Sequence, residues 1–174
     1  MEGRRVIIVC LAAVLFAGCS HQVPQRPSQR KGEAPQVDSA QLALMQLNKE
    51  LAEAADQQLM QKVLAEDEPY ALYEGNVWAL ISNKGDTSSA SPKANEEWVV
   101  HMRVSSLDGQ LFKDSEGTYR IGKCELPPAV DANIQEWHPG AHVKMIAPWY
   151  SAFGMHGTED IPAYENVIIE IDIR

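Results

Sequence analysis

The fold is decided by residues 140–174, which read GAHVKMIAPWYSAFGMHGTEDIPAYENVIIEIDIR. Apolar and polar residues alternate in residues 141–147 and again in residues 166–173. An alternation with a period of two is typical of strands that bury one face. Both segments are therefore expected to lie in one antiparallel sheet.

The loop between these two strands is unusually long. It has about eighteen residues, and a loop of that length in a compact domain is usually either disordered or functional. Trp149, Tyr150 and Phe153 lie in it together with Ile161 and Pro162. So many apolar side chains argue against disorder, and the composition of the loop favours a functional role.

The N-terminus has the features of a secretory signal. Two arginines precede an apolar run over residues 6–17, which is too short to span a membrane. The run ends in Ala-Gly-Cys19, which resembles the lipobox of bacterial lipoproteins. Residues 1–18 are therefore expected to be a lipoprotein signal peptide and Cys19 to be lipidated. An ordinary signal peptide followed by an incidental cysteine is the alternative.

The residues after Cys19 and the charge of the chain indicate how the protein is held at a membrane. Residues 19–37 are rich in proline and polar residues, which is typical of a disordered tether. The formal net charge of −9 makes nucleic acid and anionic lipid surfaces poor partners. Attachment is therefore expected through the lipid on Cys19. The resemblance to bacterial lipoproteins implies, by the sorting rule of the enterobacterial ones, that the non-acidic Ser20 directs the protein to the outer membrane of the cell envelope, facing the periplasm.

Residues 38–69 are predicted to form a long N-terminal helix. Asp38 and Gln41 have the spacing of a capping box, and Pro69 prevents the helix from continuing. Apolar residues recur every three or four positions along one face: Leu44, Leu47, Leu51, Ala55, Leu59 and Val63. This face has two interpretations, which are packing on the protein's own domain and homodimer formation through residues 38–68.

Residues 70–174 are predicted to form an α+β domain. Strands are expected at residues 77–82, 97–106 and 117–122, with a tight Asp-Gly turn after the second. A short helix is expected at residues 127–137. The prediction from this pattern is an antiparallel sheet with the helix packed on one face. Cys124, the only thiol after Cys19, is expected to be a small core residue.

Several short matches within this domain resemble FKBP-type peptidyl-prolyl cis-trans isomerases. Residues 98–101 (WVVH) stand where that family has a Val-x-Val-His-Tyr strand, and residues 107–112 (LDGQLF) match its Leu-Asp-Gly-x-x-Phe turn. Residues 119–122 resemble its Phe-x-Leu-Gly segment, residues 126–137 its helix, and residues 140–174 its C-terminal third. The resemblance implies an FKBP-like fold, in which a curved antiparallel sheet of about five strands is wrapped around one short helix, here preceded by a long helix. It also implies an isomerase of the cell envelope. Its expected partners are proline-containing or partly unfolded envelope polypeptides.

The resemblance also implies an apolar binding pocket that needs no cofactor and no metal. The residues expected to act in catalysis are Phe112, Phe153 and Ile161. The residues expected to bind substrate are Met102, Tyr119, Leu126, Pro127, Val130 and Ile169. The reaction is rotation about an X-Pro amide, which is slow because the C–N bond has partial double-bond character. An apolar pocket that fits the twisted amide suffices for this reaction.

The pocket departs from the family pattern at several positions. Met102 replaces a tyrosine, Lys113 an aspartate and Phe153 a tyrosine, and Val130 replaces the tryptophan that forms the floor. Losing an indole gives up on the order of 100 Å² of contact, or roughly 2–3 kcal/mol. Two functions therefore remain, which are an isomerase with a degenerate pocket and a catalytically weak or inactive FKBP-like binding module. Trp137 or Trp149 is a candidate to fill the gap at Val130.

Overall fold

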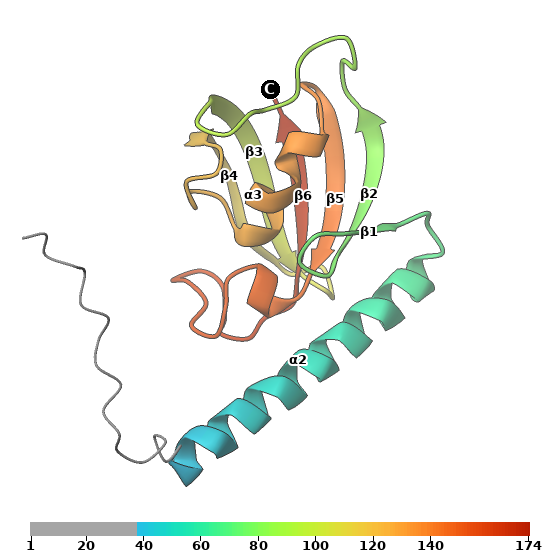
Figure 1. The fold of residues 1–174 in the computed structure, drawn as a ribbon. Coiled ribbons are helices and arrows are strands. Elements are labelled where there is room, and N and C mark those ends of the chain that lie inside the picture. Colours follow the sequence, from blue (N-terminus) through green and yellow to red (C-terminus); the bar gives the residue numbers. More distant parts are fainter. Residues whose placement is uncertain (1–37) are drawn as a thin grey trace, which may run out of the picture. The chain divides into compact units, whose positions relative to one another are not determined.

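A computed structural model describes residues 38–174 of the chain (Figure 1). The predictions of a signal peptide, of a lipidated Cys19 and of a tether at residues 19–37 therefore lie outside the described residues. Between Asp38 and Arg174, no helix has both the length and the apolar character that crossing a membrane requires.

The first element is the predicted long helix, α2 (Ser39–Glu66). Its N-terminus is capped by Asp38, whose carboxylate accepts a hydrogen bond from the amide of Ala40 at 3.3 Å. Its C-terminus is set by Asp67, which adopts a left-handed conformation with φ of 52°. The following Pro69 could not have continued the helix.

A single antiparallel sheet follows, with the strand order β1-β2-β5-β6-β3-β4 (Figure 1). The strands are β1 (Ala71–Tyr73), β2 (Val77–Lys84), β3 (Glu97–Ser106), β4 (Leu111–Arg120), β5 (Ala141–Ala147) and β6 (Val167–Ile173). The prediction that the last two strands lie in one antiparallel sheet is confirmed, and β5 and β6 are neighbours in it. The α+β class is confirmed as well.

The sheet differs from the prediction at its two edges. It has six strands because the short β1 pairs with β2. At the other edge, β4 is one strand over Leu111–Arg120, whereas a separate short strand was predicted at residues 117–122. Along an edge strand, apolar and polar residues alternate only weakly because the strand is only partly covered. It ends before Gly122, which has φ of 73°.

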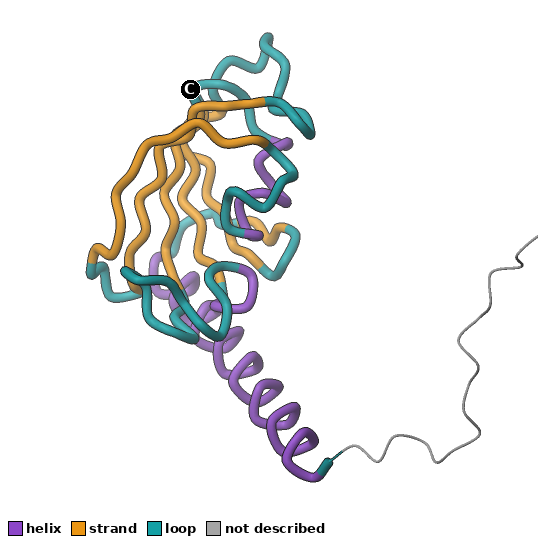
Figure 2. The backbone as a smooth tube through the Cα atoms, turned by 90° about the vertical axis from the view of Figure 1, so that its left-hand side faces the viewer, coloured by secondary structure: helices purple, strands orange, loops and turns teal. Residues whose placement is uncertain are grey.

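A short helical segment lies against one face of the sheet, and the strands curve around it (Figure 2). It consists of α3 (Pro128–Asn133) and the 3₁₀ turn η1 (Ile134–Glu136), where one continuous helix over residues 127–137 was predicted. Its buried side chains include Val130 and Ile134, each with 0% exposure. They form the main core together with the inward side chains of the strands.

The turn between β4 and α3 places Cys124 differently from the prediction. Cys124 is exposed and has a left-handed φ of 58°. Its amide donates a hydrogen bond to the carboxylate of Asp131 at 3.3 Å. The backbone geometry of the turn therefore determines the position of this cysteine, and the prediction of a core residue was wrong.

The opposite face of the sheet carries a second, smaller core that includes α2. Leu59 has 0% exposure and packs with Ile146 and Ile168, which point outward because their neighbours along each strand point to α3. The first turns of the same helix, from Ser39 to Leu47, are exposed within the described structure. Its exposed apolar residues are Leu42, Leu44, Met45 and Leu47, at 50–66% exposure.

Candidate functional site

All nine residues predicted for the pocket are buried or partly buried around the core that the sheet forms with α3. Five of them are buried in the main core: Met102, Leu126, Val130, Ile161 and Ile169. Three are partly buried and pack against that core: Phe112, Tyr119 and Phe153. The remaining one, Pro127, is buried and occupies the N-cap position of α3. Positions spread over some seventy residues thus contribute to one apolar cluster.

The strands supply the wall of this cluster through their alternation. Met102 on β3 and Ile169 on β6 face α3, and Val104 pairs with Ile169 across the two strands. On the edge strand β4, Tyr119 lies close to Gly117. A Cβ atom at Gly117 would lie 3.2 Å from the tyrosine ring, so a larger residue there would crowd the ring.

The long loop of residues 148–166 contributes Ile161 and Phe153 to the same core and is folded tightly. It begins with the 3₁₀ turn η2 (Trp149–Ser151). Its far end closes through a hydrogen bond of 2.8 Å from the Thr158 amide to the Ile161 carbonyl. Gly157 makes this closure feasible, because it has φ of 63° and its missing Cβ would lie 2.2 Å from that carbonyl oxygen. Ile161 is thereby held inward at 1% exposure.

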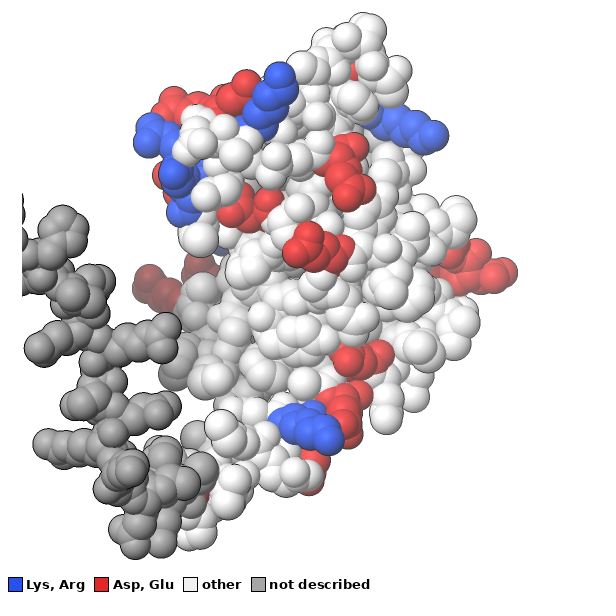
Figure 3. Space-filling view, viewed as in Figure 1, with Lys and Arg blue, Asp and Glu red and all other residues white. Residues whose placement is uncertain are grey.

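The exposure of these residues distinguishes a floor from a rim. Val130, Ile161 and Ile169 are at most 1% exposed and can form only the floor. The aromatic side chains of Phe112, Tyr119 and Phe153 are partly exposed and can contact a ligand. Uncharged side chains occupy most of the face that carries α3 and the loop (Figure 3). Several acidic side chains lie among them, and lysines and arginines lie towards the margins.

Neither tryptophan considered as a replacement for the missing indole lies at the rim. Trp137 is 2% exposed within the main core, and its ring packs edge-on against Tyr73 with centroids 6.2 Å apart. Trp149 is 7% exposed and packs against the rings of Tyr150 and Tyr164 at 5.4 and 4.9 Å. Of the two, Trp137 alone belongs to the core that contains Val130.

Two cavities lie away from the predicted residues. One of about 500 Å³ lies between α2 and the chain around Leu107 and Tyr164, with mostly polar walls that include Gln58, Gln61 and Asn166. Another of about 220 Å³ is bordered by Ile81, Trp137 and His138, among others. Neither is lined by the aromatic residues predicted for catalysis.

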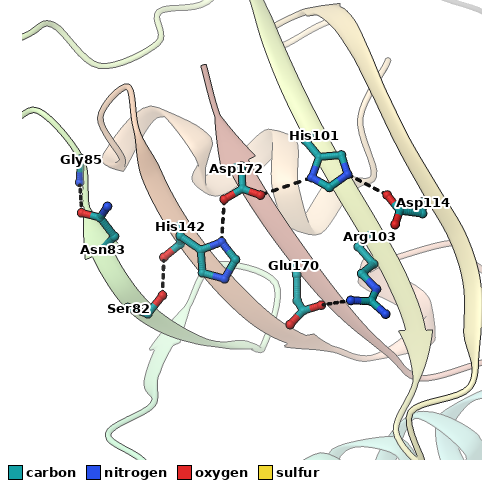
Figure 4. Close-up of polar contacts among 9 residues, drawn as sticks. All are labelled: Ser82, Asn83, Gly85, His101, Arg103, Asp114, His142, Glu170 and Asp172. Atoms are coloured by element: carbon teal, nitrogen blue, oxygen red, sulfur yellow. Dashed lines mark hydrogen bonds and ion pairs between the residues drawn. The ribbon is translucent and has the colours of Figure 1, made fainter.

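A polar cluster occupies the outer face of the sheet, away from α3 (Figure 4). Asp172 on β6 lies between His142 on β5, at 2.6 Å, and His101 on β3, at 3.2 Å. His101 also contacts Asp114 at 2.7 Å. Hydrogen bonds with Asp172 and Asp114 raise the pKa of His101. Burial alone would raise the pKa of Asp172, but hydrogen bonds from His142 and His101 outweigh it and lower that pKa.

This outer cluster points to structure and not to catalysis. Its members are cross-strand neighbours in the sheet, since Asp172 pairs with both histidines. Such pairs stabilise the order of strands. Within residues 38–174, no group of three or more His, Cys, Asp or Glu side chains is placed to hold a metal ion.

The base of the loop contains residues that the sequence did not single out. Asn166 is 8% exposed, and its side-chain oxygen accepts a hydrogen bond from the Trp149 amide at 3.0 Å. Its amide nitrogen donates to Gln58 on α2 at 2.9 Å. A polar residue directly before an apolar strand was the only signal for this contact.

Comparison with known proteins supports the fold. No family model matches the chain, and no curated protein matches it by sequence. Among solved structures, it is similar to FkpA from Escherichia coli with a TM-score of 0.60 and 18% identity, covering 79% of this chain and 64% of that one. It is also similar to a peptidyl-prolyl cis-trans isomerase from Pseudomonas syringae with a TM-score of 0.58 and 20% identity, covering 70% of this chain and 92% of that one.

These two likenesses concern the fold, because the identities are low. The chain spans about two thirds of the length of FkpA, at 64%. The α+β fold predicted from the sequence, a curved antiparallel sheet around a short helix with a long helix before it, is confirmed as FKBP-like.

Proposed function

We propose that the domain of residues 70–174 is a peptidyl-prolyl cis-trans isomerase that binds X-Pro segments of polypeptides. The observation that carries this proposal is that Phe112, Tyr119 and Phe153 are partly buried and pack against the apolar core that contains Val130 and Ile169. The likeness of the fold to an isomerase structure supports it.

The proposed mechanism requires only a binding site of suitable shape and low polarity. The partly exposed aromatic rings would pack on the proline ring, and the apolar floor would exclude water from the amide. The planar amide is more charge-separated than the twisted one, so an apolar site raises the free energy of the planar form more. The site would therefore lower the barrier to rotation without a nucleophile or a proton transfer.

The second candidate function is an FKBP-like module that binds polypeptides without isomerising them. The observation that favours it is Val130, which is fully buried where the family has a larger indole. A shallower contact with the proline ring would lose affinity for the twisted amide. Lys113 in place of an acidic residue adds a second departure at the rim.

One assay separates the two functions. The cis-to-trans rate of a tetrapeptide with a Phe-Pro bond is measured with the protein and with its Phe153→Ala variant. The Met155→Ala variant is the matched control, because Met155 is 42% exposed in the same loop as Phe153. An enhancement that Phe153→Ala reduces and Met155→Ala preserves supports the isomerase. An uncatalysed rate with retained peptide binding supports the module.

We further propose that the protein acts in the cell envelope. The sequence around Cys19 supports lipid attachment, most directly at the outer membrane facing the periplasm, and residues 19–37 would serve as the tether. Proline-containing or partly unfolded envelope polypeptides would then be its substrates. Fractionation of cells that express the Cys19→Ser variant tests this, and an unchanged membrane association would contradict it.

We also propose that two copies associate through residues 38–68. Leu44 and Leu47 lie on one face of α2 and are 56% and 50% exposed, and a spacing of three and four residues suits a helix–helix seam. Sedimentation of residues 38–174 tests this, with Leu44→Gln/Leu47→Gln expected to shift a dimer to monomer. A wild-type monomer at micromolar concentration would contradict it.

A further inference from the structure

The loop that carries Phe153 and Ile161 is hydrogen-bonded to α2 at both of its ends. Near its start, the Tyr150 hydroxyl donates to the carboxylate of Asp56 at 2.5 Å. At its end, the Asn166 side chain donates to Gln58 at 2.9 Å. A third contact joins the Tyr164 hydroxyl to Asn48 at 3.3 Å. Because all three partner residues lie in α2, this helix fixes the base of the loop.

Asp56 is the centre of this set of contacts. The oxygen that accepts from Tyr150 also accepts from the Asn76 side chain at 2.6 Å. Asn76 in turn donates to the Tyr150 hydroxyl at 3.1 Å, which closes a triangle. Burial and the hydrogen bond to Asp56 raise the pKa of Tyr150. The phenol therefore stays neutral at physiological pH and remains a donor.

The third corner of the triangle belongs to a turn that also contacts α3. Asn76 lies in the turn between β1 and β2, with φ of 59°. In the same turn, the carbonyl of Gly75 accepts from the Ser151 hydroxyl at 2.5 Å. The backbone of Glu74 makes two hydrogen bonds with the Asn133 side chain, at 3.2 and 3.1 Å. Asn133 is 1% exposed and belongs to α3.

This turn therefore contacts α2, the loop and α3 at once. The loop carries the rim of the candidate site, and α3 carries part of its floor through Val130. A loop whose base is fixed loses less conformational entropy when it binds a ligand. It also holds its side chains closer to the productive geometry.

We propose that Asp56 is a positioning residue for the candidate isomerase site, acting through Tyr150 and Asn76 on the loop that carries Phe153. The inference rests on the proposed function and extends it, because it makes α2 a part of the isomerase unit in addition to any role in association. Asp56 does not touch substrate in this account. Asp56 determines the position of the loop and therefore of Phe153, which belongs to the rim of the candidate site.

The test uses the protein of residues 38–174 and the variants Asp56→Ala and Tyr150→Phe. The control is Glu53→Ala, which removes from the same helix a carboxylate that pairs with Lys49 at 3.7 Å. Amide hydrogen exchange is measured by mass spectrometry in peptides that cover residues 149–164. Isomerase kcat/KM is measured on the Phe-Pro tetrapeptide.

We expect Asp56→Ala and Tyr150→Phe to speed exchange in the loop and to lower kcat/KM, by about tenfold for Asp56→Ala, since small misplacements of a site cost rate steeply. Asp56→Asn keeps an acceptor oxygen and should recover most of the loss. The double variant Asp56→Ala/Tyr150→Phe should lower kcat/KM little more than Asp56→Ala alone, because both changes break the same hydrogen bond. Glu53→Ala should match the wild type in both readouts.

The two proposals fail in different ways. An uncatalysed rate for the wild type would overturn the proposed function, and the positioning role would then be judged on loop exchange and on peptide binding. Loop exchange in Asp56→Ala equal to that in Glu53→Ala would overturn the positioning role. Faster exchange with unchanged kcat/KM would overturn it as well. If Asp56→Ala does not fold, Tyr150→Phe decides the matter, because it keeps the ring and removes only the hydroxyl.

Discussion

Replacing Leu59 by alanine measures how firmly α2 is joined to the sheet. Leu59 has 0% exposure and packs with Ile146 and Ile168 on the outer face of the sheet. A buried leucine cut to alanine loses its transfer free energy and leaves a cavity, and such changes cost about 2–5 kcal/mol. The contact is bordered by partly buried side chains that can relax into the space. We therefore expect about 2–4 kcal/mol for Leu59→Ala.

The matched control is Leu44→Ala, in the same helix and with the same chemical change. Leu44 is 56% exposed, so its replacement should alter the free energy of unfolding by no more than about 0.5 kcal/mol in the monomer. Both variants are unfolded in urea and followed by circular dichroism at a concentration below that of any self-association.

The difference between the two variants tests the packing of α2 directly. If Leu59→Ala and Leu44→Ala both lower the free energy of unfolding by the same small amount, the helix is not held against the sheet. A two-step transition in Leu59→Ala, with helix lost first, would show that α2 unfolds separately. The expected result is one transition, shifted strongly in Leu59→Ala alone.

Three further predictions concern the loop and the charged surface. Gly157→Ala should lower the free energy of unfolding by more than about 2 kcal/mol in thermal or urea unfolding, because its Cβ would lie 2.2 Å from a carbonyl oxygen. Gly154 has φ of 74° and open space around it, so Gly154→Ala should cost only about 1 kcal/mol. Equal losses in the two variants would contradict the tight closure of the loop. The raised pKa of His101 means that its charged form favours folding below its ordinary value of 6.5 and that this stabilisation is lost as the pH rises through the raised pKa. Asp172→Asn should therefore lower the urea midpoint more at pH 6 than at pH 8.5, and a loss independent of pH would refute the pairing. Burial would raise the pKa of Glu66, but hydrogen bonds from lysine and tyrosine partners lower it to about 2. Glu66→Gln should therefore be less stable than the wild type at pH 7, and the difference in stability should shrink as the pH falls from 4.5 towards 2. A difference in stability that persists near pH 2 would contradict those hydrogen bonds.

The parts of the fold that follow a strong local pattern could be predicted from the sequence. The bounds of β3 and β5 match the prediction because apolar residues alternate along them and both are central strands. The edge strand β4 was divided in the prediction, since its exposed polar residues give no alternation. The position of Cys124 was also missed, because a left-handed turn outweighed the tendency of cysteine to be buried.

The long helix shows why periodicity alone cannot assign a partner. The apolar stripe of α2 looks the same along its length, yet Leu59 is buried against the sheet and Leu47 is 50% exposed. Which half is covered depends on where the outward residues of β5 and β6 lie. That placement follows from the register of the sheet and is absent from the helix sequence.

The members of the candidate site were predicted from the resemblance to a known family, and the structure shows them to be buried or packed around the main core. Their roles in binding and catalysis stay a prediction. The contacts of Asp56 with Tyr150 and Asn76 could not be predicted, because they join polar residues far apart in the sequence. Hydrogen bonds of this kind carry no periodic signal.

The most direct test of the proposed function is exchange spectroscopy by NMR on a peptide with a single Phe-Pro bond. The account predicts that a catalytic amount of residues 38–174 speeds cis–trans exchange above the uncatalysed rate. It also predicts that Phe153→Ala removes most of this effect while remaining folded. Exchange that is unchanged by the wild-type protein, or an enhancement that persists fully in Phe153→Ala, would contradict it.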